Sequence, residues 1–150
     1  MSTVHVTTKI EAPIQEVWDI AMDPTRFSEW VTIHRSVADV SSRPLRRGST
    51  MTQLLHLRGV SFHVHWELVD LSAPNRAEWE GRGPAHTHAR ICYRLTRDGD
   101  DATEFEYINE FTTPGGPLGM VASRVIVGGA SEREARHSLA RLKALLESDS

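Results

Sequence analysis

The sequence predicts an α+β fold in which a seven-stranded curved antiparallel sheet wraps around a long C-terminal helix, with two short helices between strands 1 and 2. Three observations lead to this expectation. Six segments between Ser36 and Thr112 alternate polar and apolar residues, as half-buried strands do. Short turns join them, which favours antiparallel neighbours. An apolar stripe at helical spacing then runs to the C-terminus.

The N-terminal part predicts one strand and two short helices. The strand alternates polar residues with the inward set Val4, Val6, Thr8 and Ile10. Pro13 suits the first position of a helix, whose apolar face would hold Ile14, Val17, Trp18 and Ala21. Asp23 followed by Pro24 is typical of an N-cap, and the second short helix that it begins carries Phe27 and Trp30.

Six strands follow, and alternation predicts which of their faces is buried. Their expected bounds are Ser36–Ser42, Ser49–Leu57, Val60–Leu71, Arg76–Gly83, His86–Thr96 and Ala102–Thr112. In the longest of them the apolar set is Val60, Phe62, Val64, Trp66 and Leu68, and the residues between are polar or charged. One face of the sheet is therefore apolar and aromatic, as expected for an antiparallel sheet that is covered on one side.

The covering element is predicted to be a helix from Pro117 to Glu147, about 45 Å long at 1.5 Å per residue. Its inward stripe reads Leu118, Val121, Val125, Gly128, Glu132, Ala135, Leu139, Leu142 and Leu146. The C-terminal half of this stripe is bulky, whereas Gly128 and Gly129 in the middle lack side chains. We therefore expect a space between helix and sheet at this point.

Composition limits the classes of function. The 150 residues suit one domain, 1–150, and the net charge of −3 without a basic cluster gives no reason to expect nucleic acid as a partner. No apolar run is long enough to insert in a membrane, and the N-terminus lacks signal-peptide features. The single Cys92 excludes an internal disulfide. We expect a cytoplasmic protein, either monomer or homodimer, without a cofactor.

Several motifs resemble the START-like (SRPBCC) superfamily, whose helix-grip fold has this order of elements. They are "IEAPIQEVWDIAMDPTRFSEW" at Ile10–Trp30, Gly48, "NEFTTPGGPLGM" at Asn109–Met120 and "SLARLKALLE" at Ser138–Glu147. The chain looks most similar to the bacterial group of polyketide cyclase/dehydrase and lipid-transport proteins. The resemblance covers essentially the whole chain, and it specifies the fold better than the function, because the superfamily hosts carriers, cyclases, hydrolases and receptors.

The resemblance implies a deep, mostly apolar cavity between helix and sheet that accepts a hydrophobic small molecule. A pocket for such a molecule would have a volume of about 300 Å³ or more. The inward positions of the predicted elements supply the candidate ligand-binding residues, which are Trp30, Gln53, Leu55, Phe62, Trp66, Trp79, Tyr93, Tyr107, Asn109, Val121, Val125, Gly128 and Glu132. The alternative is that the aromatic residues fill a solid core. The polar residues Gln53, Asn109 and Glu132 favour a cavity, because each would be costly in a dry core without partners.

Histidines form the most conspicuous metal-like pattern. His63 and His65, and likewise His86 and His88, are spaced two apart on predicted strands, which places each pair on one face. Both pairs fall on the outward face, and Arg82 is expected between His65 and His88. A cation is a poor neighbour for a metal, so we predict no functional metal site, although adventitious binding by these histidines stays open.

Enzymatic function has weaker support. Cys92 lies on the outward side of its strand without an identifiable base, and no nucleophile-elbow or phosphate-loop motif occurs. The aromatase/cyclases of the superfamily use an inward arginine, and the corresponding position here is Trp66. Glu132 and Tyr107 are the weak catalytic candidates, although Glu132 could equally form a surface ion pair with Arg136. We therefore expect a carrier or binding protein, with a polyketide cyclase-type enzyme as the alternative and a co-chaperone-type protein-interaction module third.

Overall fold

The structure is a computed structural model that describes residues 2–57, 59–112 and 130–148. Its strands are β1 (Ser2–Ile10), β2 (His34–Ala38), β3 (Thr50–Leu57), β4 (Val60–Ser72), β5 (Arg76–Arg82), β6 (His88–Arg97) and β7 (Thr103–Thr112). Its α-helices are α1 (Ile14–Ala21), α2 (Phe27–Trp30) and α4 (Ala130–Glu147). Two 3₁₀ turns, η1 (Pro24–Arg26) and η2 (Pro84–His86), complete the described elements.

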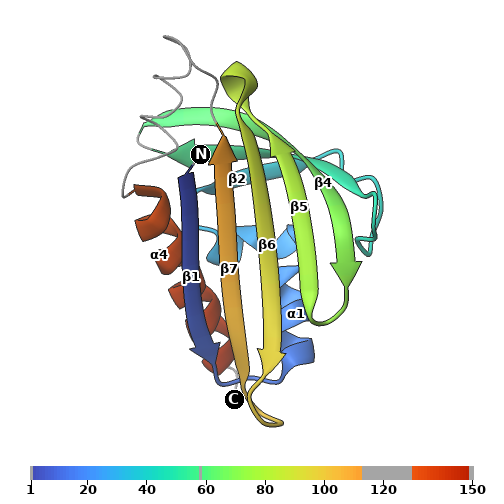
Figure 1. Cartoon of the computed structure of the whole chain (residues 1–150), viewed down its shortest axis with the longest axis vertical. Helices are drawn as coiled ribbons and strands as arrows, with labels where there is room; N and C mark the ends of the chain where they lie inside the picture. Colours follow the sequence, from blue (N-terminus) through green and yellow to red (C-terminus); the bar gives the residue numbers. More distant parts are fainter. Residues whose placement is uncertain (1, 58, 113–129, 149–150) are drawn as a thin grey trace.

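The seven strands form one antiparallel sheet in the order β1-β7-β6-β5-β4-β3-β2. The sheet is strongly curved, and α1 and α4 lie on the same side of it (Figure 1). This arrangement confirms the predicted α+β helix-grip fold. Strands β2 to β7 pair in sequence order, whereas β1 crosses to the far edge and pairs with β7.

The core lies between the inner face of the sheet and the helices. From Val64 to Leu68 the burial along β4 alternates as predicted, with Val64, Trp66 and Leu68 buried and the residues between them exposed. Val60, expected on the same buried face, is exposed at the start of the strand. On α4 the buried side chains Leu139, Leu142 and Leu146 recur at spacings of three and four residues. The α4 helix therefore packs its C-terminal half closely on the sheet, as the stripe in the sequence indicated.

The predicted entry to the short helices is confirmed at Asp23. Its carboxylate accepts hydrogen bonds from the Thr25 backbone N–H (3.0 Å) and from the Thr25 hydroxyl (2.7 Å). The cap begins the 3₁₀ turn η1, which leads directly into α2. The buried Phe27 and Trp30 of α2 thereby face the core beneath the sheet.

Two strands differ from their expected bounds by two residues or more, and the other four of the six differ by at most one residue at either end. The second strand is His34–Ala38 and not Ser36–Ser42, because Asp39 has a φ of +57° and so leaves the extended conformation. The strand expected to begin at His86 begins at His88, since Ala85 and His86 have φ values of +57° and +59° within η2. The predicted helix start at Pro117, with Leu118, Val121, Val125, Gly128 and Gly129, lies outside the described residues.

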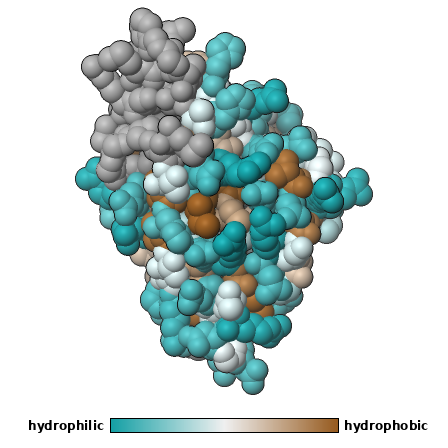
Figure 2. Space-filling view, in the orientation of Figure 1, coloured by the Kyte–Doolittle hydropathy of each residue, from teal (hydrophilic) through white to brown (hydrophobic). Residues whose placement is uncertain are grey.

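The outer face of the sheet is mainly hydrophilic, with scattered hydrophobic residues (Figure 2). Cross-strand ion pairs lie on this outer face, including Arg90 with Glu80 at 2.7 Å and Arg94 with Glu106 at 3.6 Å. Val60, at 42% exposure, is the large hydrophobic residue that the described chain leaves exposed. Across the described residues, no helix has the length and apolar character needed to cross a membrane.

Candidate functional site

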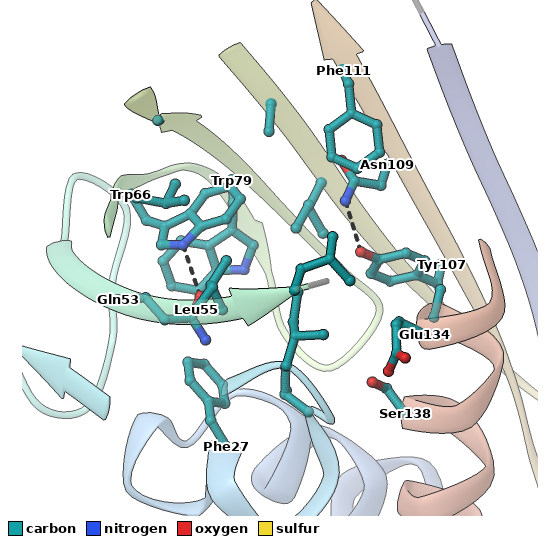
Figure 3. Close-up of a pocket in the computed structure, with 18 of the residues that line it drawn as sticks. Phe27, Gln53, Leu55, Trp66, Trp79, Tyr107, Asn109, Phe111, Glu134 and Ser138 are labelled. Atoms are coloured by element: carbon teal, nitrogen blue, oxygen red, sulfur yellow. Dashed lines mark hydrogen bonds between the residues drawn. The ribbon is translucent and has the colours of Figure 1, made fainter. Parts of the chain in front are cut away.

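A cavity of about 140 Å³ lies between the inner face of the sheet and the helices α2 and α4. This volume is smaller than the expected value of about 300 Å³. Strands β3 to β7 supply most of its wall, and α2, the segment after it and the first turns of α4 supply the rest. Figure 3 shows the cavity with aromatic rings on several sides. The wall is mainly apolar, as in binding sites for small hydrophobic molecules.

All the residues expected to line a cavity from α2 and the strands lie around this one. They are Trp30, Gln53, Leu55, Phe62, Trp66, Trp79, Tyr93, Tyr107 and Asn109. They meet there because the strands place alternate side chains on one face and the curvature of the sheet turns that face inward. The expected lining residues Val121, Val125 and Gly128 lie outside the described residues.

Glu132 does not line the cavity, which corrects the sequence-based expectation. Its side chain is 52% exposed and forms an ion pair of 2.9 Å with Arg136, one helical turn further along α4. A carboxylate at the edge of the helical stripe gains more from water and this i,i+4 pair than from burial without a cation. The acidic residue that does line the cavity is Glu134.

On one side of the cavity a complete hydrogen-bonded chain holds Trp66. The indole Nε1 of Trp66 donates to Gln53 Oε1 at 3.0 Å, and the Gln53 amide Nε2 donates to His34 Nδ1 at 2.8 Å. An indole is a donor only, so the amide oxygen of Gln53 must face Trp66. His34 Nδ1 must then carry a lone pair, which places the imidazole proton on Nε2. Burial lowers the pKa of His34 and so favours this neutral form.

A glycine on β5 makes room for the same indole. Gly81 is paired with Trp66 across the β4–β5 ladder and is buried. A Cβ at Gly81 would lie 2.5 Å from Trp66 Cζ3 and 2.8 Å from Val64 Cγ1. The Trp66 ring therefore rests directly on the backbone of Gly81, so packing and hydrogen bonding together position this wall of the cavity.

On the opposite side the polar groups are only partly paired. The Asn109 amide Nδ2 donates to the Tyr107 hydroxyl at 2.9 Å, whereas Asn109 Oδ1 is buried and has no hydrogen-bond partner. Figure 3 shows this pair across the cavity from Gln53 and Trp66. Burial raises the pKa of Tyr107 to about 12, with the Asn109 hydrogen bond acting in the opposite direction. The Tyr107 hydroxyl therefore stays protonated at neutral pH.

A second unpaired group lies on α2. The indole Nε1 of Trp30 is buried without a hydrogen-bond partner, and the whole residue is only 2% exposed. The Trp30 ring meets Tyr93 edge-on, with 6.2 Å between ring centroids, and Tyr93 lies 6.0 Å from Tyr107. Burial raises the pKa of Tyr93 as well. Trp30, Tyr93 and Tyr107 thus form a continuous aromatic wall with protonated polar groups.

The remaining polar cluster ties the segment after α2 to α4. The Thr32 hydroxyl donates to Glu134 Oε2 at 2.5 Å, and the Thr32 backbone N–H donates to Ser138 Oγ at 3.0 Å. Both Glu134 and Ser138 line the cavity. The lining set expected from the sequence does not contain them, and it also lacks several apolar lining residues, among them Phe27, Val31, Ile33, Met51 and Phe111. Phe111 continues the inward alternation of Tyr107 and Asn109, a signal that could have identified it.

The histidine pattern agrees with the expectation only in part. His63 and His65 lie on β4, whereas His86 lies in η2 with a φ of +59° and does not share a strand face with His88. Arg82 pairs with His65 on β4 and with His88 on β6, so a cation separates the two imidazoles. Among residues 2–57, 59–112 and 130–148, no three His, Cys, Asp or Glu side chains are grouped as metal ligands. Cys92 is buried, although it lies on the outward side of β6.

The chain belongs to the polyketide cyclase / dehydrase and lipid transport family, whose model matches residues 1–147. Among curated proteins it is similar to Toxin Rv0910 of Mycobacterium tuberculosis, with 23% identity over 140 residues, which is 93% of this chain and 94% of the relative. The similarity therefore spans nearly the whole length of both chains.

Solved structures show the same fold at low identity. A START superfamily protein from Mycobacterium smegmatis superposes with a TM-score of 0.76 and 14% identity, covering 99% of both chains. The Zhui aromatase/cyclase from Streptomyces sp. R1128 gives a TM-score of 0.74 and 14% identity, covering 97% of this chain and 93% of the other. These likenesses support the START-like fold predicted from the sequence.

Proposed function

We propose that this family member binds a hydrophobic or aromatic small molecule, lipid-like or polyketide-like, in the cavity between α4 and the sheet and serves as a carrier or binding protein. The observation that carries the proposal is a mostly apolar, aromatic-walled cavity of about 140 Å³ in the centre of the fold. Protein interiors are normally close-packed, so an unfilled space of this size beneath α4 supports a binding site for another molecule.

The size of the cavity suits a ring-sized apolar group. An engineered cavity of about 150 Å³ with an apolar wall stays dry and binds benzene. Transfer of apolar surface from water to such a site is favourable by about 25 cal/mol per Å². The rings of Trp66, Trp79 and Tyr93, which line the cavity, offer flat surfaces against which an aromatic ligand packs.

Ligand binding is tested with a cavity-filling variant and a matched control on the same strand. Ala89 lines the cavity from β6, whereas Thr96 is exposed on the outward side of that strand. We expect Ala89→Phe to weaken binding of a fluorescent apolar probe at least about tenfold, and Thr96→Phe to leave it unchanged. Equal affinity in the parent and both variants would contradict the proposal. Native mass spectrometry of protein purified from its own host would identify the bound compound.

A polyketide cyclase-type enzyme is the second candidate, because an acidic side chain and a tyrosine both line the cavity. Glu134 and Tyr107 are those residues, and the raised pKa of Tyr107, about 12, keeps its hydroxyl protonated, so the hydroxyl can donate a hydrogen bond and does not act as a base. Among the described residues no Arg or Lys lines the cavity to polarise a carbonyl, which favours the binding role. Turnover of an aromatic polyketide that Glu134→Gln abolishes without loss of binding would reverse this order. A co-chaperone-type role remains third, since the outer face is mainly hydrophilic (Figure 2).

A further inference from the structure

The two unpaired buried atoms of the cavity wall differ in their chemistry. Trp30 Nε1 carries a proton and donates only, whereas Asn109 Oδ1 is a carbonyl oxygen and accepts only. Trp30 is 2% exposed and Asn109 is 7% exposed, so bulk water does not reach either side chain freely. A buried polar group without a partner destabilises the fold, which makes each atom a position where a bound molecule has most to contribute.

The neighbouring side chains in the described part of the wall form no hydrogen bond with either atom. Tyr107 accepts the one hydrogen bond that Asn109 donates, and it leaves Asn109 Oδ1 without a donor. Gln53, the other amide of the cavity, already accepts from Trp66 through its oxygen and donates to His34 through its nitrogen. Ring contacts run from Trp30 to Tyr93 and from Tyr93 to Tyr107, whose hydroxyl meets Asn109, so the unmet donor and the unmet acceptor lie at the two ends of one row of contacts.

The ionisable residues of the cavity wall limit the net charge that a ligand can carry. Besides the two protonated tyrosines, its ionisable residues are Glu134, whose carboxylate accepts from Thr32, and His88, which is exposed. No lysine or arginine is present among the described lining residues. An anionic ligand would lose its hydration without gaining a cation and would meet the like charge of Glu134.

We propose that Trp30 and Asn109 are the specificity-determining residues of the cavity and select an uncharged ligand whose apolar body carries both a hydrogen-bond acceptor and a hydrogen-bond donor. The ligand's acceptor receives the Trp30 indole N–H, and its donor binds the Asn109 carbonyl oxygen. A hydroxyl both donates and accepts, so an aromatic alcohol can bond to Asn109 as a donor or to Trp30 as an acceptor. The inference rests on the proposed function, since it assigns the polar contacts of that same cavity.

Three compounds that share the naphthalene ring system separate the contributions of the apolar body, the hydroxyl and the charge to binding affinity. Naphthalene supplies the apolar body alone, 2-naphthol adds an uncharged hydroxyl, and 2-naphthoate adds a negative charge. Measured by calorimetric titration at pH 7, 2-naphthol is expected to bind about tenfold more tightly than naphthalene, which corresponds to about 1.4 kcal/mol. The affinity of 2-naphthoate is expected to fall below that of naphthalene. Equal affinity for naphthalene and 2-naphthol, or tightest binding of 2-naphthoate, would overturn the inference.

Variants of Trp30 and Asn109 test whether these two residues cause the preference for 2-naphthol over naphthalene. Asn109→Leu and Trp30→Phe each remove one polar atom. The preference for 2-naphthol over naphthalene is expected to fall to about threefold or less in the variant that lacks the atom bound by the hydroxyl. The control is Glu104→Leu, an exposed position on β7, which should keep the parental preference. Because Trp30 is large and buried, Asn109→Leu is the decisive variant if Trp30→Phe folds poorly. A parental preference in a folded Asn109→Leu variant would refute the role of Asn109.

The same titrations distinguish this inference from the proposed function. If naphthalene and 2-naphthol both fail to bind and Ala89→Phe has no effect on the apolar probe, the cavity is not a binding site and the proposed function fails. If naphthalene binds as tightly as 2-naphthol and the probe is displaced, the cavity binds apolar molecules, and only the roles of Trp30 and Asn109 are wrong.

Discussion

Two buried amides face the cavity from opposite sides, and only one of them is fully paired. Gln53 accepts from Trp66 and donates to His34, so both ends of its amide are used. Asn109 donates to Tyr107, but its carbonyl oxygen has no partner (Figure 3). Both side chains are similarly buried, at 6% and 7% exposure, so burial does not explain the difference.

The difference separates a structural role from a binding role. A buried polar network adds rigidity when every member is paired and is costly when one is not. The Gln53 chain therefore fixes the Trp66 ring and the shape of one wall. The Asn109 side keeps an unpaired acceptor that the fold itself does not satisfy. Substitutions on the Gln53 side should mainly change stability, and those on the Asn109 side should mainly change binding.

The largest effect is expected from Gly81→Ala, which acts on the fully paired side. The new Cβ would lie 2.5 Å from Trp66 Cζ3 and 2.8 Å from Val64 Cγ1, so the indole must move. We expect a loss of about 3 kcal/mol in the free energy of unfolding, at the upper end of the range for overpacked cores. Urea denaturation would measure it.

The control for this variant is Gly99→Ala. Gly99 lies in the β6–β7 turn with a φ of +81°, and nothing lies within 4 Å of the position that a Cβ would take there. Its loss is expected to be about 1 kcal/mol, the backbone cost of a positive φ without a clash. If Gly81→Ala were no more destabilising than Gly99→Ala, the Trp66 ring would not depend on close contact with β5.

A direct comparison of the two amides uses the same substitution on each side. Gln53→Leu leaves the buried Trp66 N–H without its acceptor, and we expect it to cost about 2 kcal/mol of unfolding free energy. Asn109→Leu removes an unpaired oxygen along with one hydrogen bond, so the melting temperature should stay close to that of the parent. Thermal unfolding of both variants checks the contrast. A larger loss for Asn109→Leu would show that its role is structural.

The fully paired and half-paired sides also differ in how far the sequence predicts them. Alternation alone places Gln53, Trp66 and Asn109 on the inner face, since a period of two is strict along a strand. It does not reveal which amide finds partners. The partner of Gln53, His34, lies in the segment where β2 begins earlier than expected, and pairing across strands depends on tertiary contacts that periodicity does not encode.

For helical residues near the edge of the apolar stripe of α4, the sequence predicts the direction of the side chain less well than it does for strand residues. Glu132 and Glu134 are close in sequence, and the three–four spacing favours Glu132 as the inward residue. The structure places Glu134 at the cavity because Thr32, from the segment after α2, donates a hydrogen bond to its carboxylate. A contact between segments about a hundred residues apart in sequence leaves no local signal, so spacing alone could not identify it.

Thr32→Val tests this third polar cluster and is expected to have a smaller effect. The substitution keeps the shape of Thr32 but removes its hydrogen bond to Glu134. We expect a loss of about 1 kcal/mol in unfolding free energy, the typical net value of one hydrogen bond, with most of the probe affinity retained. Glu132→Gln, which breaks the exposed pair with Arg136, is the control and should cost less. A cost equal to that of the control would mean that Thr32 does not anchor α4.

The smallest effect is expected from a change of pH. It should alter the stability that the Gln53 side of the cavity contributes, and it should leave ligand binding at the Asn109 side unchanged. Burial lowers the pKa of His34 below its ordinary value of 6.5, so the unfolded chain binds a proton more readily than the folded protein. Stability should therefore be constant above pH 6.5 and fall as the pH decreases from there towards the folded pKa. Protonation of Nδ1 would also replace the lone pair that accepts from Gln53.

His34→Phe separates this contribution from that of the other histidines, and it can keep an edge-on contact like the one between His34 and Phe27. Urea denaturation at about pH 7.5 and at about pH 5.5, one unit either side of the reference pKa, should show a larger loss of stability in the parent than in the variant. On the other side, Asn109 does not titrate and the pKa of Tyr107 is about 12, so neither should impose a pH dependence on 2-naphthol binding in this range. Identical losses of stability in parent and variant would show that the Gln53 chain does not require a neutral His34.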